Sequence, residues 1–266
     1  MNLSVIDTHA HLDMPEFDSD REAVLQRAAD AGVSTIITIG IDSPSNLKAV
    51  ELAQKYPGIF AAVGIHPQES KKVTAEEFTE MASLIKNPRV VAVGEMGLDY
   101  YREYSPRETQ IRVFQQQLDI AKNAGLPVII HSRQAQEDMI SILKSWCNSF
   151  SLPAGKCRGV IHCFGGDAAA AAAYIDMGFC ISIGGYIGYP SSAQLREVIP
   201  GIPLDRLVVE TDCPFLPPQK FRGKRNEPSY TLITLEILAG IKKVSLEEMA
   251  RYTTQNATKL FNLNQY

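Results

Sequence analysis

The chain has 266 residues, of which 45% are hydrophobic, and a net charge of −4; a chain of this size can bury a large core, and we expect one domain over residues 1–266. No apolar run reaches the roughly 18 residues of a membrane span and no signal-like segment opens the chain, so we expect a cytoplasmic protein without a membrane partner. The negative charge excludes a broad cationic surface for nucleic acid, but not a nucleic-acid substrate held at one end.

Short β-rich runs alternate with longer amphipathic stretches along the whole chain. This alternation predicts parallel strands joined by helical crossovers. Eight strands are expected at 3–7, 33–39, 59–65, 89–94, 127–131, 158–162, 178–183 and 206–210. A first helix is expected between the capping stretch Asp18-Ser19-Asp20 and a stop at Gly32, and later helices at 43–55, 74–86, 105–124, 134–148, 167–176, 192–198, 229–242 and 246–260.

The predicted fold is an α/β, single (β/α)8 TIM barrel, because eight parallel strands with helical connections most simply close into one and about 250 residues is its usual size. An open doubly wound sheet is the alternative. The chain lacks a Gly-x-Gly-x-x-Gly loop after its first strand, which counts against a dinucleotide-binding sheet of that kind. The sequence leaves the oligomeric state open and is compatible with a monomer.

Every histidine of the chain stands at the end of an apolar run, namely His9, His11, His66, His131 and His162. This repeated placement suggests that all five converge on one site at the carboxyl ends of the strands, and metal binding is the leading reason for such convergence. His9 and His11 are two residues apart, so they share one face of a strand. The five cysteines contain no Cys-x-x-Cys pair, which argues against a thiolate zinc site and a disulfide framework.

Two carboxylates occupy equivalent positions. Glu95 follows the apolar run Val90–Val93 and Gly94, and Asp212 follows Leu207–Val209 by three residues. A buried carboxylate is costly unless it is paired, hydrogen-bonded or metal-bound. Four histidines and these two acids supply ligands for two divalent cations if one carboxylate bridges, and such a pair can activate water for phosphoester hydrolysis. Nitrogen-rich ligands suit Zn, Mn or Fe, and Mg also remains a candidate.

At these residues the chain resembles the TatD family of metal-dependent hydrolases, within the amidohydrolase-like barrels. The matching segments run in family order from the first residues to beyond position 220, and their combination is specific. They are Asp7-Thr8-His9-Ala10-His11-Leu12, Gly64-Ile65-His66-Pro67, Gly94-Glu95-Met96-Gly97-Leu98-Asp99-Tyr100, Pro127-Val128-Ile129-Ile130-His131-Ser132-Arg133, His162-Cys163-Phe164, Glu210-Thr211-Asp212-Cys213-Pro214 and Arg222-Gly223-Lys224-Arg225-Asn226-Glu227-Pro228.

The resemblance implies deoxyribonuclease activity, often as a 3′-to-5′ exonuclease with DNA ends or single strands as substrate. It also implies that one metal is bound by His9, His11 and Asp212, that Glu95 bridges, and that the second metal is bound by His131 and His162. The chain departs from the commonest family pattern at Gln68, where another histidine often stands, and at Gly165, which replaces a frequent serine. Both departures bear on substrate preference and remove no ligand.

Catalytic roles are assigned to Glu95, Asp212 and His66. Asp212 is placed to take a proton from a metal-bound water. His66 is assigned to the substrate phosphate or transition state; the alternative is that it forms a hydrogen bond to a metal-binding side chain and supports that ligand. Glu210 is expected to share the strand face of Asp212, where it either orients a ligand or is a buried structural acid.

Substrate contacts are predicted from cations and aromatic rings near the strand ends. Arginine grips phosphate oxygens bidentately, and aromatic rings stack on unpaired bases. The candidates are Arg133, Arg222, Arg225 and Tyr100, while Lys224 is interpreted as part of a solvated loop and Tyr101 and Tyr104 as either stacking residues or rim packing.

The residues are compatible with three functions. The first is a nuclease that attacks phosphodiesters with a metal-bound hydroxide at a two-metal site. The second keeps the barrel and metals but hydrolyses an ester or amide, such as the ester of a D-aminoacyl-tRNA, since a metal polarises carbonyl and phosphoryl oxygens alike. The third is a non-catalytic metal-binding protein, which ranks last because structural zinc sites are closed by four ligands. The arginines favour the nuclease.

Overall fold

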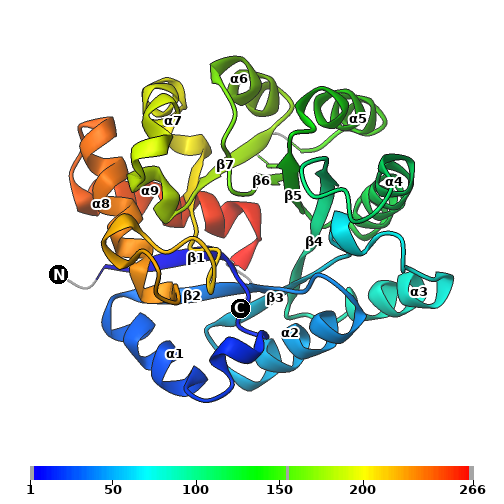
Figure 1. Cartoon of the computed structure of the whole chain (residues 1–266), viewed down its shortest axis with the longest axis horizontal. Coiled ribbons are helices and arrows are strands. Elements are labelled where there is room, and N and C mark those ends of the chain that lie inside the picture. Colours follow the sequence, from blue (N-terminus) through cyan, green and yellow to red (C-terminus); the bar gives the residue numbers. More distant parts are fainter. Residues whose placement is uncertain (1–2, 154–155, 264–266) are drawn as a thin grey trace.

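Eight parallel strands form one sheet in sequential order, and the sheet curls into a nearly closed barrel inside a ring of helices (Figure 1). The structure is a computed structural model that describes residues 3–153 and 156–263; the remainder of the predicted domain 1–266 lies outside the described residues. The strands are β1 (Val5–Ala10), β2 (Val33–Ile39), β3 (Ile59–Val63), β4 (Val90–Asp99), β5 (Val128–Arg133), β6 (Gly159–Ile161), β7 (Phe179–Ile183) and β8 (Leu207–Val209).

Helices follow the strands and pack on the outside of the barrel (Figure 1). None of those in the described ranges is long and apolar enough to cross a membrane. The helices are α1 (Arg21–Asp30), α2 (Ser43–Lys55), α3 (Ala75–Leu84), α4 (Arg107–Ala124), α5 (Gln136–Asn148), α6 (Ala168–Asp176), α7 (Ala193–Val198), α8 (Thr231–Lys242) and α9 (Leu246–Leu260).

The predicted TIM barrel is confirmed, but three strands extend further than the sequence suggested. β1 was expected at 3–7 and β5 at 127–131, yet they run to Ala10 and Arg133. β4 was expected to end at 94 and continues to Asp99, so Glu95 lies within the strand. The prediction ended each strand near its first polar residue, whereas polar side chains directed into the barrel mouth let the strand pairing continue.

The first helix begins after Asp20 as predicted, but the predicted capping hydrogen bond is absent. Asp20 stands at the N-cap of α1, but its side chain makes no capping hydrogen bond; it accepts instead from both terminal nitrogens of Arg225, each at 2.7 Å. A charged donor outcompetes a backbone amide for the same carboxylate. Gly32, with φ of 88°, ends the helix as predicted, because this left-handed conformation favours glycine.

The two ends of the barrel differ. An apolar cluster inside the strands, which includes Ile37 and Ile39, continues into Leu260 and Phe261 at the end of α9. Thr254 of α9 donates a hydrogen bond of 2.7 Å to the carbonyl of Ser4, just before β1. Helix α9 therefore covers the amino-terminal ends of the strands. The opposite, carboxyl-terminal mouth is left for a site.

The loop after β8 is tied to α1 by an ion pair. The Arg27 guanidinium meets the Glu227 carboxylate with Nε at 3.0 and 3.1 Å and Nη2 at 2.7 Å. Burial opposes ionisation of Glu227, but the hydrogen bonds from Arg27 outweigh it and lower the pKa of this carboxyl below its ordinary value of 4.5. A bidentate contact of this kind is stronger than an ordinary surface pair.

We predict that Arg27→Ala lowers the free energy of unfolding by about 1–2 kcal/mol at pH 7. Because the pKa of Glu227 is lower in the folded than in the unfolded chain, the pair stabilises above pH 4.5 and its contribution is lost as the pH falls through the folded-state pKa. Denaturant melts of both proteins between pH 7 and pH 3 measure this. A stability difference that stays constant over that range would contradict it.

Candidate metal centre

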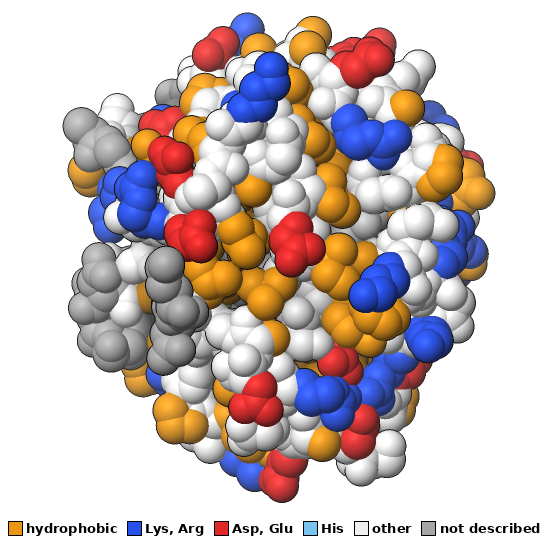
Figure 2. All heavy atoms as spheres, turned by 90° about the vertical axis from the view of Figure 1, so that its left-hand side faces the viewer, with side chains coloured by type: hydrophobic (Ala, Val, Ile, Leu, Met, Phe, Trp, Pro, Cys, Tyr) orange, Lys and Arg blue, Asp and Glu red, His pale blue; other side chains and the backbone are white. Residues whose placement is uncertain are grey.

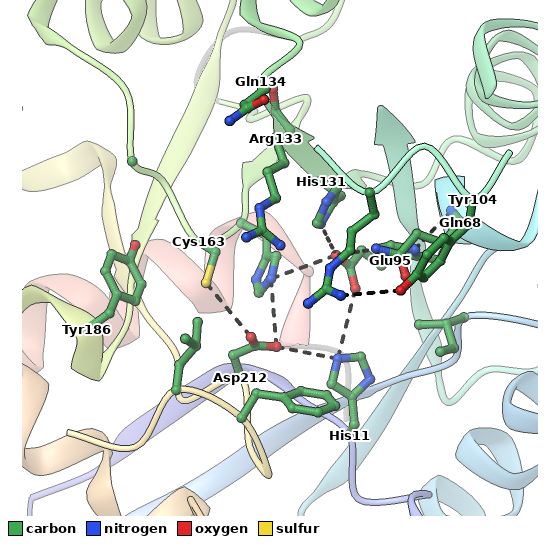
Figure 3. A pocket seen from close by; sticks show the side chains of 18 of the residues that line it. His11, Gln68, Glu95, Tyr104, His131, Arg133, Gln134, Cys163, Tyr186 and Asp212 are labelled. Carbon is green, nitrogen blue, oxygen red and sulfur yellow. Dashed lines mark hydrogen bonds and ion pairs between the residues drawn. The ribbon is translucent and has the colours of Figure 1, made fainter. Parts of the chain in front are cut away.

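The carboxyl-terminal mouth of the barrel holds a cavity of about 970 Å³. Figure 3 shows side chains from different strands pointing into it, with Glu95 and Asp212 close to His11 and His131. His66 and His162 also line the cavity, and His9 lies beneath it, buried. All five histidines and both predicted carboxylates are therefore brought together, as the sequence predicted for their positions.

His9, His11 and Asp212 form one compact group of donors. The Nε2 atoms of the two rings lie 3.3 Å apart, and Asp212 Oδ1 lies 3.7 Å from the first and 3.4 Å from the second. The two histidines are nearly excluded from water, whereas Asp212 leaves 13% of its side chain exposed. The alternation of side chains along β1 places both rings on one face, as predicted from their spacing.

Glu95 lies at the centre of the histidines. Its Oε2 is 3.5 Å from His9 Nε2 and its Oε1 is 3.8 Å from His162 Nε2, so the carboxylate faces both rings. Oε1 also accepts a hydrogen bond of 2.7 Å from His131 Nδ1. A carboxylate with each oxygen directed at a different set of ring nitrogens has the placement of a bridging ligand.

Hydrogen bonds on the far side of two rings fix which nitrogen faces the centre. His11 Nδ1 lies 3.1 Å from the carbonyl of Ile39, and His162 Nδ1 lies 2.9 Å from Glu210 Oε2. Both partners accept, so in the neutral rings the proton resides on Nδ1 and the Nε2 lone pair faces the centre. That is the tautomer a metal needs.

Glu210 is itself held rigidly. Ser182 Oγ donates to Oε2 at 2.6 Å, and the backbone N–H of Cys163 donates to Oε1 at 2.8 Å. The sequence left open whether Glu210 orients a ligand or is a structural acid. Its contact with His162 supports orientation.

His66 has the opposite arrangement. Its Nδ1 accepts a hydrogen bond of 3.2 Å from the backbone N–H of Gln68, which leaves the proton of the neutral ring on Nε2. Burial lowers the pKa of His66 to about 3, so the ring is neutral. Nε2 lies 3.6 Å from Glu95 Oε1 and is a donor rather than a ligand. His66, Glu95 and His131 nevertheless form a compact group.

His131 lies between two carboxylates. Its Nε2 is 3.4 Å from Oδ2 of Asp99, a fully buried residue that also accepts from Gln68 Nε2 at 2.9 Å. β4 reaches Asp99 because Gly97 lies directly against the His131 carbonyl, where a Cβ atom would clash. Gln68, at a position where the family often has histidine, thus contacts the acid behind a predicted ligand.

The carboxylates strongly favour a cation at this centre. Burial alone disfavours a charged ring, yet the carboxylate of Asp212 raises the pKa of His11 to about 9. Burial likewise opposes charge on His131, but Asp99 and Glu95 raise its pKa to about 8. A divalent cation competes with these protons for the same lone pairs.

The donor set fits divalent metal ions. Two imidazole nitrogens directed at each other at 3.3 Å, as in His9 and His11, can share only one proton or face a common cation. Imidazole with carboxylate is the ligand chemistry of Zn, Mn and Fe sites.

The predicted substrate residues fall into two groups. Arg133 lines the cavity and points into it in Figure 3, and its guanidinium lies 3.9 Å from the ring centroid of Tyr101. The other three are not among the described residues that line the cavity. The Tyr100 hydroxyl donates to Asp138 at 2.7 Å, the Arg222 guanidinium covers the Tyr189 ring at 4.2 Å, and Arg225 pairs with Asp20.

Sequence reasoning missed several residues in or behind the cavity. Asp99, which is buried behind His131, has the same strand parity as Glu95, so a longer β4 would have placed both acids on one face. Phe215 and Leu216 also line the cavity, and they carried no recognised motif. Arg102 lines it as well and donates to the Tyr104 hydroxyl at 3.2 Å.

Comparisons with known proteins show the family of the chain. A family model described as TatD related DNase matches residues 6–262. A Bacillus subtilis (strain 168) protein described as the uncharacterized metal-dependent hydrolase YabD is 42% identical and aligns over 98% of this chain and 100% of its own length. An Erwinia amylovora protein described as 3′-5′ ssDNA/RNA exonuclease TatD is 36% identical over 97% and 100% of the two chains.

The crystal structure of YJJV, a TatD homolog from Escherichia coli K12, matches with a TM-score of 0.91 and 34% identity, covering 98% of this chain and 99% of that one. The fold, the donors and these relatives define a metal-dependent hydrolase that acts on ester bonds. The chain belongs to the family of TatD-related DNases.

We predict that Glu210→Gln weakens divalent-cation binding by about 10- to 100-fold, the usual cost of losing a partner behind a metal ligand. The amide group cannot accept from the Cys163 N–H, Ser182 and His162 together, so the ring of His162 loses its fixed orientation. Titration calorimetry with Mn²⁺ or Zn²⁺ measures the affinity. Glu51→Gln, on the exposed face of α2, is the matched control; equal affinities of the two variants would contradict the assignment.

Proposed function

We propose that this protein is a nuclease that removes nucleotides from the 3′ end of single-stranded DNA or RNA with the help of two divalent cations. His9, His11 and Asp212 hold the first cation and His131 and His162 the second, with Glu95 shared between them. The chain acts in the cytoplasm, as the sequence predicts. The single observation that carries the proposal is the orientation of the rings around Glu95.

That orientation sorts the histidines by role. His11 and His162 direct lone pairs to the centre because their Nδ1 protons are committed to Ile39 and Glu210. His66 directs an N–H instead. Nitrogen lone pairs and the N–H of His66 therefore face the same carboxylate, and metal-assisted hydrolysis of a phosphate ester can use both.

When bound, two divalent cations supply an activated water and neutralise charge on the scissile phosphate. Asp212 Oδ1 faces three ring nitrogens, while its Oδ2 lies on the side of Cys163, 3.9 Å from Sγ. This second oxygen accepts the proton released as water attacks phosphorus and the ester bond to the leaving sugar oxygen breaks, and it can return that proton to the leaving oxygen. His66 Nε2–H donates to a phosphate oxygen, and the neutral state of its ring keeps it a donor throughout.

Nucleic acid is favoured as substrate by the cations at the cavity mouth. Arg133 and Arg102 both line the cavity and can grip phosphate oxygens. Elsewhere, on the face over α7 and α8, Figure 2 shows basic and acidic side chains interspersed. The basic side chains that can bind substrate are thus confined to the cavity, which fits a substrate bound by the end of a nucleic-acid strand. The relative described as 3′-5′ ssDNA/RNA exonuclease TatD supports the same substrate.

The test is hydrolysis of 5′-labelled single-stranded oligonucleotides with Mg²⁺, Mn²⁺ or Zn²⁺. We predict stepwise shortening from the 3′ end, which EDTA abolishes. Glu95→Gln and Asp212→Asn lower the rate by about 100-fold or more, because several kcal/mol of charge stabilisation are lost.

Matched controls are Glu51→Gln and Asp119→Asn, both at exposed helical positions, which keep the wild-type rate. His66→Ala keeps metal content but loses most turnover. Absence of shortening with every metal, together with release of amino acid from a D-aminoacyl-tRNA, would contradict the nuclease and favour the ester hydrolase.

A further inference from the structure

Exposed apolar side chains gather at the cavity. Five large hydrophobic residues are exposed in the described part of the chain, and three of them line the cavity, namely Tyr104, Phe215 and Leu216. Phe215 leaves 46% of its surface exposed. An isolated exposed apolar residue needs no explanation, but a group at the mouth of a polar site indicates a ligand with an apolar surface.

The exposure of Phe215 is imposed by its backbone. Buried Asn226 donates from Nδ2 to the carbonyls of Thr211 and Phe215, both at 2.7 Å. The N–H of Phe215 donates to the carbonyl of Asp212 at 2.9 Å, and the N–H of Asn226 to that of Pro214 at 3.1 Å. The loop is therefore held on both sides, and it holds the phenyl ring out in water.

The ring also lies close to the donors of the metal centre. Its centroid is 5.9 Å from that of His11, and the two rings meet edge to face at 69°. His11 contacts Asp212 in turn. A group that packs on Phe215 therefore belongs to the part of the substrate next to the reacting phosphate.

We infer that Phe215 is the platform on which the unpaired terminal base of the substrate stacks; this rests on the proposed function. A nucleobase offers a flat apolar face, and stacking accepts every base because each has one. The neighbouring Arg133 and Arg102 suit the attached phosphates. A base-paired end is disfavoured, since its terminal base must first leave the duplex stack.

The inference is tested by binding, so that it does not depend on hydrolysis. Two fluorescein-labelled single strands are compared, identical except that one has a 3′-terminal thymidine and the other a 3′-terminal abasic residue. The last linkage of both is a phosphorothioate, which hinders cleavage, and Mg²⁺ is present. Fluorescence anisotropy gives Kd for wild type, Phe215→Ala and Phe215→Leu, the latter keeping apolar volume without an aromatic face.

We expect wild type to bind the strand with the terminal base about 5- to 150-fold more tightly than the abasic strand, the range of base–aromatic stacking. In Phe215→Ala and Phe215→Leu this ratio falls to about 1 through loss of affinity for the base-bearing strand alone, whereas Phe215→Tyr restores it. The control is Leu47→Ala, because Leu47 is also an exposed apolar residue but lies on α2 and does not line the cavity. This variant keeps the wild-type ratio.

Equal loss of affinity for both strands in Phe215→Ala would overturn the inference, since a structural role affects both alike. A wild-type ratio of 1, or no binding to either strand, would overturn it as well. Hydrolysis of unmodified strands is scored separately. Base-dependent binding without hydrolysis would support the stacking role of Phe215 and contradict the nuclease activity. Hydrolysis without base-dependent binding would support the nuclease activity and contradict the stacking role.

Discussion

The hydrogen bonds between β1 and the segment that follows β8 are the contacts on which the site depends. Asp7 accepts hydrogen bonds from the Thr211 backbone N–H at 2.9 Å and its hydroxyl at 2.6 Å, and the Asp212 N–H donates to the His9 carbonyl at 2.9 Å. These bonds bring together residues about two hundred positions apart. A buried carboxylate is costly without such partners. The bonds that join β1 to the segment after β8 thus also hold His9 next to Asp212.

The loop after β8 serves two purposes through one set of contacts. Thr211 is held by Asp7 on one side and by Asn226 on the other. Asp212 follows directly and faces the ring nitrogens, and Phe215 follows three residues later and faces the cavity. A substrate bound across this short segment would have its phosphate at one end and its base at the other. A rigid segment here therefore fixes both the donor atoms of Asp212 and the ring of Phe215.

Sequence periodicity predicted the barrel and the convergence of the histidines because parallel strands bring their carboxyl ends to one mouth. It could not predict ring orientation, which depends on acceptors such as Ile39 and Glu210 far away in the chain. The Asp99 contact was hidden because β4 continues past Glu95. Charge alone suggested Arg225, but Asp20 neutralises it, and that pairing of distant residues is visible only in the fold. The ligand roles and substrate contacts remain predictions.

The central claim, that one set of donors around Glu95 binds two metal ions, is tested most directly by anomalous diffraction from crystals grown with Mn²⁺. The account predicts two anomalous peaks about 3.5–4 Å apart. One lies against His9, His11 and Asp212, the other against His131 and His162, and Glu95 lies between them. A single peak, or a second peak outside this set of residues, would contradict it.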